Sequence, residues 1–185
     1  MLKEIYRETE QKMDRAVEAI GRELAGIRTG KATTTILDGV KVEYYGTMTP
    51  LKQVASISAP DPKLLVVQPW EKNIVGDIVK AIQKADLGLN PVTEGNVIRL
   101  PIPPLNEERR REMVKLVRKF GEDGKISIRN IRRDAIEKLK KAEKDSEISE
   151  DDLHNGQKHI QEITDNHISR IDEMVEAKEA EVMEV

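Results

Sequence analysis

The sequence has no cysteine among its 185 residues, which excludes disulfide bonds, thiolate metal sites and cysteine nucleophiles. Aromatic residues make up only 3% of the chain, too few for a platform that stacks single-stranded bases. No apolar run approaches the roughly 20 residues that cross a bilayer, and the first residues lack the apolar core of a signal peptide. We therefore expect a cytoplasmic protein with no membrane partner.

Charge is plentiful and unevenly distributed. The net charge is -3, yet residues 106–144 carry 14 Lys and Arg against 8 Asp and Glu, a local charge of +6. Residues 145–185 carry 3 against 13, a local charge of -10. The acidic total therefore hides a basic segment, which is where a polyanionic partner would bind.

Three segments show the apolar spacing of amphipathic helices. The first covers residues 1–30 and is predicted to end at Thr29-Gly30, because glycine favours the conformation that stops a helix. The second begins after Asn106, a good N-cap residue, and is nearly 40 residues long. Within it, Gly121 and Gly124 each cost about 1 kcal/mol of helix stability and are interpreted as a possible bend.

The third helix is predicted to begin at Ser149, with Asp152 as the partner in a capping box. The apolar stripes of the three helices are Leu2, Tyr6, Met13, Val17, Ile20, Leu24 and Ile27; Met113, Val117, Phe120, Ile128, Ile131, Ala135, Leu139 and Ala142; and Leu153, Ile160, Ile163, Ile171, Met174 and Val182. None of these stripes can be buried alone, so the helices are expected to pack as a bundle.

Residues 31–104 have a different pattern. Alternation at 40–44 and the apolar runs at 64–67 and 97–100 predict strands, and the spacing at 74–85 predicts a short helix. The fold class is therefore α+β: an elongated three-helix bundle from residues 1–30 and 105–185, with a small β/α/β domain, 31–104, inserted after its first helix. Two crossings connect the domains, Gly30-Lys31 and Pro103-Pro104-Leu105. They are either a hinge or ordinary loops.

One face of the second helix is basic. At 100° per residue, its cations fall within an arc of roughly 120°, away from the apolar stripe, with Glu122 and Asp134 placed toward the edges. We call this set the basic strip: Arg111, Lys115, Arg118, Lys125, Arg129, Arg132, Arg133 and Lys140. Such a row suits a phosphate backbone. The alternatives are a solvated face with acidic partners one turn away, or a helical adaptor that binds an acidic protein.

Patterns for catalysis or metal binding are weak. The segment 26–32 resembles a P-loop but is one residue short and follows a helix instead of a strand. His154 and His159 are five residues apart, not the four of a helical zinc pair, and lack an obvious third ligand. His167, beside the apolar stripe, is expected at a helix interface. We therefore expect no enzyme and no cofactor.

A series of motifs, in order along the whole chain, resembles the ribosome recycling factor family. They are Arg28-Thr29-Gly30-Lys31-Ala32, Tyr45-Gly46 with Thr49-Pro50-Leu51, Leu87-Gly88-Leu89-Asn90-Pro91, Ile98-Arg99-Leu100-Pro101, Pro103-Pro104-Leu105 with Glu108-Arg109-Arg110, and Arg129-Asn130-Ile131-Arg132-Arg133-Asp134.

The resemblance implies a monomer with an L shape likened to transfer RNA, which binds the large ribosomal subunit after peptide release. Elongation factor G, which carries the GTP, would then drive the subunits apart and allow messenger and deacylated transfer RNA to leave. The residues that match the family's contacts with 23S ribosomal RNA are Arg129 and Arg132. Both belong to the basic strip, and Arg28 is predicted to join it.

Overall fold

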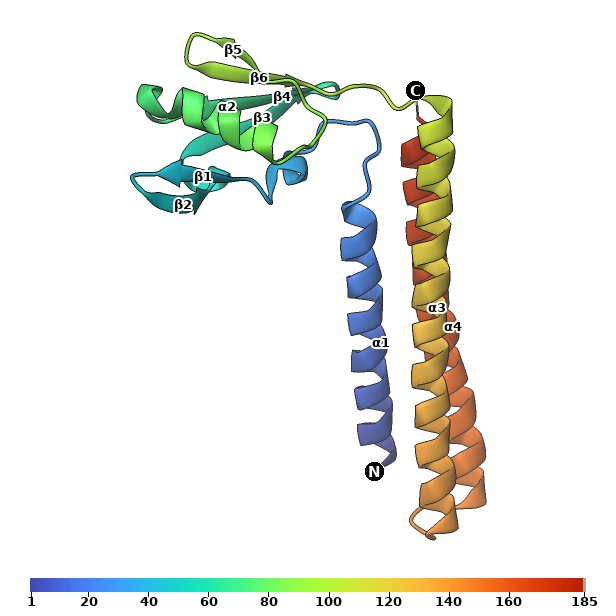
Figure 1. The fold of residues 1–185 in the computed structure, drawn as a ribbon. Coiled ribbons are helices and arrows are strands. Elements are labelled where there is room, and N and C mark those ends of the chain that lie inside the picture. The colour runs from blue at the N-terminus through green and yellow to red at the C-terminus, as the bar shows by residue number, and fades with distance from the viewer. Residues whose placement is uncertain (185) are drawn as a thin grey trace. The chain divides into compact units, whose positions relative to one another are not determined.

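The computed structural model describes residues 1–184, and the chain forms two compact units. One unit contains Met1–Ile27 and the residues from Arg110 onward, and the other contains Arg28–Arg109. The first is built from three long α-helices, and the second contains six strands and one α-helix (Figure 1). This α+β architecture confirms the predicted class.

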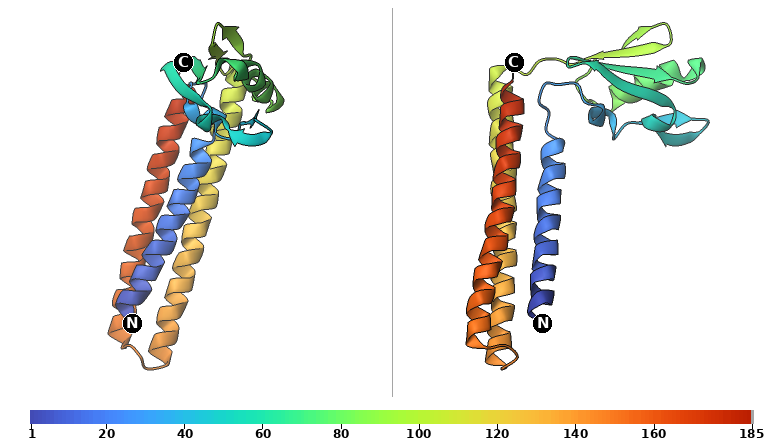
Figure 2. Two further views of the ribbon diagram at one scale, coloured as in Figure 1. Left: turned by 90° about the vertical axis from the view of Figure 1, so that its left-hand side faces the viewer. Right: turned by 180° about the vertical axis from the view of Figure 1, so that it is seen from behind.

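The helical unit is a bundle of α1 (Leu2–Ala25), α3 (Glu107–Lys144) and α4 (Glu150–Met183). The three helices run alongside one another in both views of Figure 2. Within the described residues, no helix is both long and apolar enough to cross a membrane. The predicted stripes form the bundle core, which includes Met13, Val17, Ile20, Leu24, Val117, Ile128, Ala135, Leu139, Ile160, Ile163, Ile171 and Val182.

The first helix ends earlier than predicted. It stops at Ala25, and the Gly26 N–H donates to the Arg22 carbonyl oxygen at 3.2 Å. Gly30 does adopt a positive φ of 78°, which glycine tolerates best, but it does so in the connection beyond the helix. The glycine in the sequence pattern therefore marks a turn that lies outside the helix.

The predicted starts of α3 and α4 are confirmed. The Asn106 side-chain oxygen accepts from the Arg109 N–H at 2.7 Å, which caps α3. In α4, the Ser149 Oγ accepts from the Asp152 N–H at 3.0 Å, and the Asp152 carboxylate accepts from the Ser149 N–H at 3.2 Å. This is the reciprocal capping box predicted from the sequence.

The second unit is entirely antiparallel. A hairpin pairs β1 (Lys41–Tyr44) with β2 (Thr47–Pro50), and a four-stranded sheet has the order β3-β4-β6-β5. The sheet strands are β3 (Ala55–Asp61), β4 (Leu64–Pro69), β5 (Val92–Glu94) and β6 (Val97–Pro101), with α2 (Val75–Lys84) between β4 and β5 in the chain. The sequence predicted β1, β4, β6 and α2, but not β2, β3 or β5.

Alternation along the two central strands places the core of this unit on one face of the sheet. Leu65 and Val67 of β4 and Ile98 and Leu100 of β6 are fully buried, and the α2 residues Ile78 and Ile82 belong to the same cluster. Leu64 and Val66, on the opposite face of β4, are only half-buried. The short α2 therefore covers the apolar face.

Gly121 and Gly124 lie where neighbouring helices approach α3 closely, and α3 continues as one helix through both. A Cβ atom built on Gly124 would lie 2.6 Å from Ile20 Cγ1 of α1, and one on Gly121 would lie 2.6 Å from Val175 Cγ2 of α4. Both distances are too short for real carbon contacts. The glycines thus allow close packing at the cost in helix propensity noted above.

We expect Gly124→Ala to destabilise the bundle by about 1–3 kcal/mol, because an overpacked core costs more than alanine gains as a helix former. Gly76→Ala in α2 is the control, since nothing lies within 4 Å of a Cβ there. Urea unfolding followed by circular dichroism measures both. Equal stability of the two variants would contradict a packing role for Gly124.

A polar cluster joins α1 to α4. The buried His167 ring lies between two oxygens: Nδ1 is 2.7 Å from the Ile163 carbonyl oxygen, and Nε2 is 2.7 Å from Asp14 Oδ1. Arg170 donates to the same Asp14 oxygen at 2.9 Å. The hydrogen bond from His167, together with Arg170, holds the pKa of Asp14 below its ordinary value of 3.8. His167 is therefore at a helix interface, as predicted.

A depressed carboxyl pKa stabilises the folded state above the unfolded pKa, and this stabilisation is lost as pH falls through the folded pKa. Asp14→Asn keeps an acceptor but removes the charge. We expect it to lower the free energy of unfolding by about 0.5–1 kcal/mol at pH 5.5, since Asp14 is partly exposed. The difference from the parent protein should shrink toward pH 3. A difference independent of pH in urea unfolding would contradict an electrostatic role for Asp14.

Candidate nucleic-acid interface

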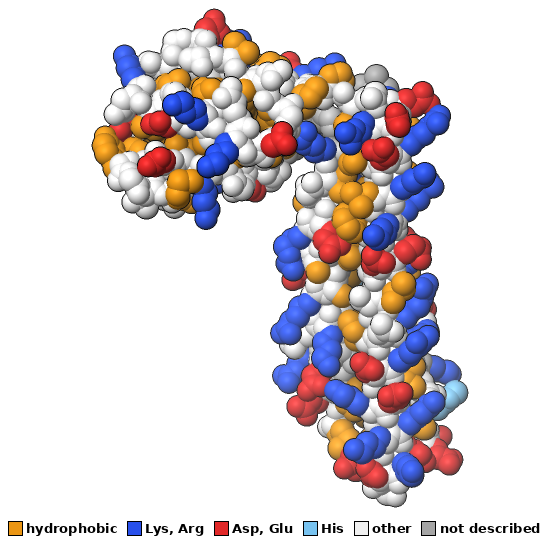
Figure 3. Space-filling view, in the orientation of Figure 1, with side chains coloured by type: hydrophobic (Ala, Val, Ile, Leu, Met, Phe, Trp, Pro, Cys, Tyr) orange, Lys and Arg blue, Asp and Glu red, His pale blue; other side chains and the backbone are white. Residues whose placement is uncertain are grey.

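Helix α3 holds the basic strip outside its buried seam, and one edge of the strip, formed by Arg118, Lys125 and Arg132, reaches α4. The seam residues Val117, Ile128 and Leu139 are fully buried. Lys and Arg side chains gather along the outer edge of α3, with acidic side chains between some of them (Figure 3). Because α3 runs unbroken for 38 residues, these cations are held in one row on a rigid support.

Four members of the basic strip carry free charge. Arg129, Arg133, Lys115 and Lys140 are exposed, and within residues 1–184 none of them lies within 4.0 Å of a carboxylate oxygen. Arg111 is exposed as well. The guanidinium groups of Arg129 and Arg133 can form bidentate hydrogen bonds with phosphate oxygens.

Two other members are already paired with acids of α4. Arg118 Nε lies 2.7 Å from Glu179 Oε1. Lys125 Nζ lies 2.5 Å from Asp172 Oδ1 and 3.5 Å from Glu122 Oε1, and its pKa is raised, chiefly by the hydrogen bond to Asp172. These two cations offer less charge to a partner than the sequence pattern indicated.

The placement of Glu122 toward an edge of the basic strip is wrong. Glu122 is seven residues from Arg129, so at 100° per residue it lies about 20° from it, inside the arc. Its carboxylate approaches Lys125, three residues later on the same helix. The middle of the strip is therefore less positive than the row of cations alone suggests.

Arg132 differs from both groups because it is half-buried and yet has no carboxylate partner among the described residues. Its Nη1 donates to the side-chain oxygen of Gln161, on α4, at 3.2 Å. Its Nε is buried and has no hydrogen-bond partner among these residues. The positive charge of Arg132 is therefore not neutralised by a neighbour.

The remaining predicted residues lie in the sheet unit. Arg28 is exposed, and its Nη2 donates to the Leu87 carbonyl oxygen, so its guanidinium has a local partner there. The predicted hinge residues Gly30, Lys31, Pro103, Pro104 and Leu105 also lie within Arg28–Arg109. A Cβ built on Gly30 would lie 3.5 Å from Leu105 Cγ, so the two crossings touch.

Backbone hydrogen bonds hold both crossings to the turn between β3 and β4. The Ala32 N–H donates to the Pro62 carbonyl oxygen at 2.6 Å, and the Ile102 N–H donates to the Lys63 carbonyl oxygen at 2.8 Å. The division between the two units falls at Ile27–Arg28 and at Arg109–Arg110, and the second of these points lies within the first turn of α3.

The histidines do not assemble a reactive site. His154 is exposed, and the His159 ring packs on Tyr6 with 4.2 Å between ring centroids. Over residues 1–184, no three His, Asp or Glu side chains are placed to hold a metal ion.

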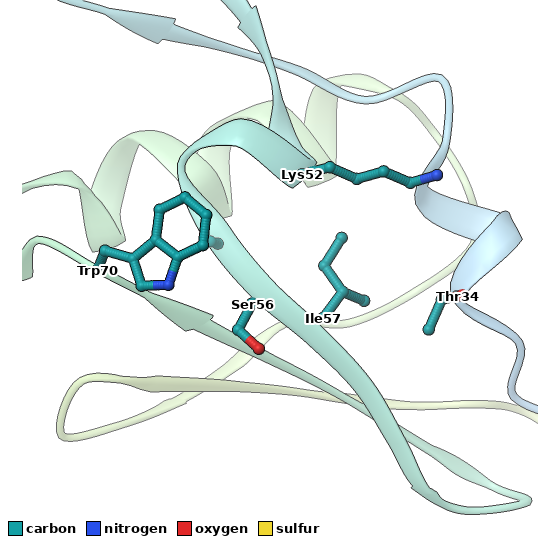
Figure 4. Close-up of a pocket in the computed structure, with 6 residues that line it drawn as sticks. Thr34, Lys52, Ser56, Ile57 and Trp70 are labelled. Carbon is teal, nitrogen blue, oxygen red and sulfur yellow. The ribbon is translucent and has the colours of Figure 1, made fainter.

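Sequence reasoning missed a shallow hollow in the sheet unit, beside the exposed Trp70 (Figure 4). Thr34, Ser56 and Ile57 line it, and the amine of Lys52, also in its lining, lies 2.7 Å from Asp38. Lys52 is the only charged residue among the six that line the hollow, and Asp38 compensates its charge. A single tryptophan after a strand forms no spacing pattern from which the hollow could have been predicted.

Comparison with known proteins supports the motif-based resemblance. The family model for ribosome recycling factor matches residues 20–183. The ribosome-recycling factors of Halalkalibacterium halodurans and Bacillus pumilus are 54% and 50% identical over 185 residues, with all of both chains covered. That of Burkholderia mallei is 53% identical over 182 residues, 98% of each chain.

Solved structures agree. A solution structure of ribosome recycling factor is 44% identical, with a TM-score of 0.78 over all of this chain and 98% of the other. A second is the Thermus thermophilus factor, described with Escherichia coli elongation factor G as bound to the E. coli post-termination complex. It is 47% identical, with a TM-score of 0.66 over all of both chains.

With a match along nearly its whole length, full-length relatives at 50–54% identity and the same α+β architecture, the chain belongs to the ribosome recycling factor family, whose members are non-enzymatic translation factors.

Proposed function

We propose that this protein binds the post-termination ribosome and, with elongation factor G and GTP, promotes its separation into subunits and the release of messenger and deacylated transfer RNA. Two observations support the proposal: the family membership and the structure of the related T. thermophilus factor with elongation factor G. The protein would act as a monomer in the cytoplasm and would need no cofactor of its own, since its partner carries the GTP.

The proposed docking surface is the basic strip, and its partner is 23S ribosomal RNA of the large subunit. The observation that most directly supports this surface is the row of exposed cations without carboxylate partners on one face of a rigid helix, with Arg129 as its clearest member. Each phosphate that such a cation contacts releases counterions, so affinity should fall steeply with salt. Arg118 and Lys125 should contribute less, because Glu179 and Asp172 already compensate their charge.

An acidic protein partner is the alternative for the same surface. An acidic protein would also bind in a salt-dependent way, so salt dependence alone does not distinguish an RNA partner from a protein partner. A competition experiment distinguishes them: isolated 23S ribosomal RNA should displace the protein from large subunits if the strip binds RNA. Failure to compete would favour the helical adaptor.

The function itself is tested with purified post-termination ribosomes, elongation factor G and GTP. Addition of the protein should produce free subunits in sedimentation, and its omission should not. Intact ribosomes in the complete mixture would refute ribosome recycling by this chain.

We expect Arg129→Ala to weaken binding to large subunits and to lower the slope of log affinity against log salt by about one. Lys138→Ala is the matched control, because Lys138 is on α3 outside the strip and pairs with Glu8 of α1 at 3.5 Å. Both variants lose one positive charge. An equal effect of the two would mean that net charge, and not the strip, governs binding.

We also propose that the two crossings bend as a hinge. This bending would be required for splitting the ribosome but not for binding it. Cysteines introduced together as Gly30→Cys and Leu105→Cys would form the only disulfide, since the chain has no other cysteine. The oxidised protein should bind ribosomes but split them poorly, and reduction should restore splitting, which controls for strain at Gly30. Full activity of the oxidised form would remove bending at these crossings from the mechanism.

A further inference from the structure

The side chain of Arg132 leaves α3 toward the seam with α4 and ends on a polar pair of α4. Gln161 Oε1 accepts from Arg132 Nη1 at 3.2 Å, and Gln161 Nε2 donates to Asp165 Oδ1, one helical turn further on, at 2.8 Å. Arg132, Gln161 and Asp165 are thus joined by two hydrogen bonds, each from a donor to an acceptor. Arg132 Nε is buried and has no hydrogen-bond partner among residues 1–184, and the guanidinium is held by the bond from Nη1 to Gln161.

The direction of the Gln161 amide follows from its two neighbours. A carboxylate only accepts hydrogen bonds and a guanidinium only donates them. The NH2 group of Gln161 must therefore face Asp165, and its oxygen must face Arg132. If the amide were reversed, two acceptors would meet at one end and two donors at the other. Asp165 consequently fixes the orientation of Gln161, and Gln161 in turn holds Arg132.

Arg132 is held by a neutral side chain, whereas Arg118 and Lys125 are held by carboxylates, and this difference affects how much positive charge each can offer to a partner. Glu179 and Asp172 hold Arg118 and Lys125 by direct carboxylate contacts, which also compensate their charge. Gln161 holds Arg132 through a neutral oxygen, and the carboxylate of Asp165 lies beyond the amide. Arg132 is thus restrained while its charge stays available, which reduces the ordering that binding would otherwise require.

From this geometry we infer that Gln161 and Asp165 are positioning residues for Arg132, which hold its guanidinium ready for an RNA phosphate without neutralising it. The inference deepens the proposed function and rests on it for the identity of the partner. It assigns a binding role to the acidic fourth helix of the fold, α4, through a neutral side chain.

The first test replaces the neutral holder by a charged one. Gln161→Glu keeps the shape of the side chain but places a carboxylate on Arg132. We expect about a tenfold loss of affinity for large subunits and a salt slope lowered by about one, as for Arg132→Ala. Gln157→Glu is the matched control. Gln157 lies one turn earlier on α4 and is also half-buried, and its replacement by Glu changes the charge by the same amount. Its affinity should fall by less than threefold.

A double-mutant cycle shows whether Gln161 acts through Arg132. In an Arg132→Ala background, Gln161→Glu should change affinity by less than twofold, because no guanidinium remains to be neutralised. A full tenfold loss in that background would overturn the positioning role and indicate a separate contact by Gln161.

A measurement without ribosomes separates this inference from the proposed function. The heteronuclear NOE of the Arg132 Nε–H should be high in the parent protein and fall in Gln161→Ala and Asp165→Asn, with circular dichroism unchanged. If the NOE falls as expected but Arg132→Ala binds large subunits normally, the positioning stands and the assignment of Arg132 to RNA fails. If Arg132→Ala weakens binding but neither Gln161→Glu nor Gln161→Ala does, the positioning role fails alone.

Discussion

Burial of one apolar face of α3 determines where every cation of that helix can lie. Val117, Ile128 and Leu139 are fully excluded from solvent. At Gly121 and Gly124 the neighbouring helices approach so closely that rotation of α3 about its own axis would bring larger side chains into contact with them. Because side chains follow the helix at 100° per residue, fixing the seam also fixes the outward row. The basic strip is therefore a consequence of core packing as much as of its own charges.

The acidic composition of α4 acquires a physical role in this arrangement. A helix with so many carboxylates beside a basic one would neutralise it if all of them faced the seam with α3. The contacts instead are selective: Glu179 and Asp172 compensate Arg118 and Lys125, while Arg129 and Arg133 have no such partner in the described part of the chain. The acids of α4 thus limit the positive surface to part of α3.

How much the sequence could predict depended on the range of the interaction involved. The caps at Asn106 and Ser149 and the apolar stripes are local patterns, and the structure confirms them. Strand β3, with one proline and two serines, has a weak local preference for strand and is stabilised by its pairing with β4. In the same way, the partners of Arg118 and Lys125 lie about 50 to 60 residues away in the chain, and helical periodicity carries no information about them.

A surface that binds RNA must satisfy two opposed requirements. Restraint of an arginine favours tight binding, since less side-chain freedom is lost on association, but the usual restraint is a carboxylate, which cancels the charge that phosphate recognises. An amide avoids the conflict because its oxygen is a good acceptor without net charge. A carboxylate on the other side of the amide can then orient it. Because this carboxylate is farther from the arginine, it compensates the positive charge less. Arg132, Gln161 and Asp165 have this arrangement, so under the proposed role of the basic strip a glutamine on the acidic helix contributes more to RNA binding than the acids around it.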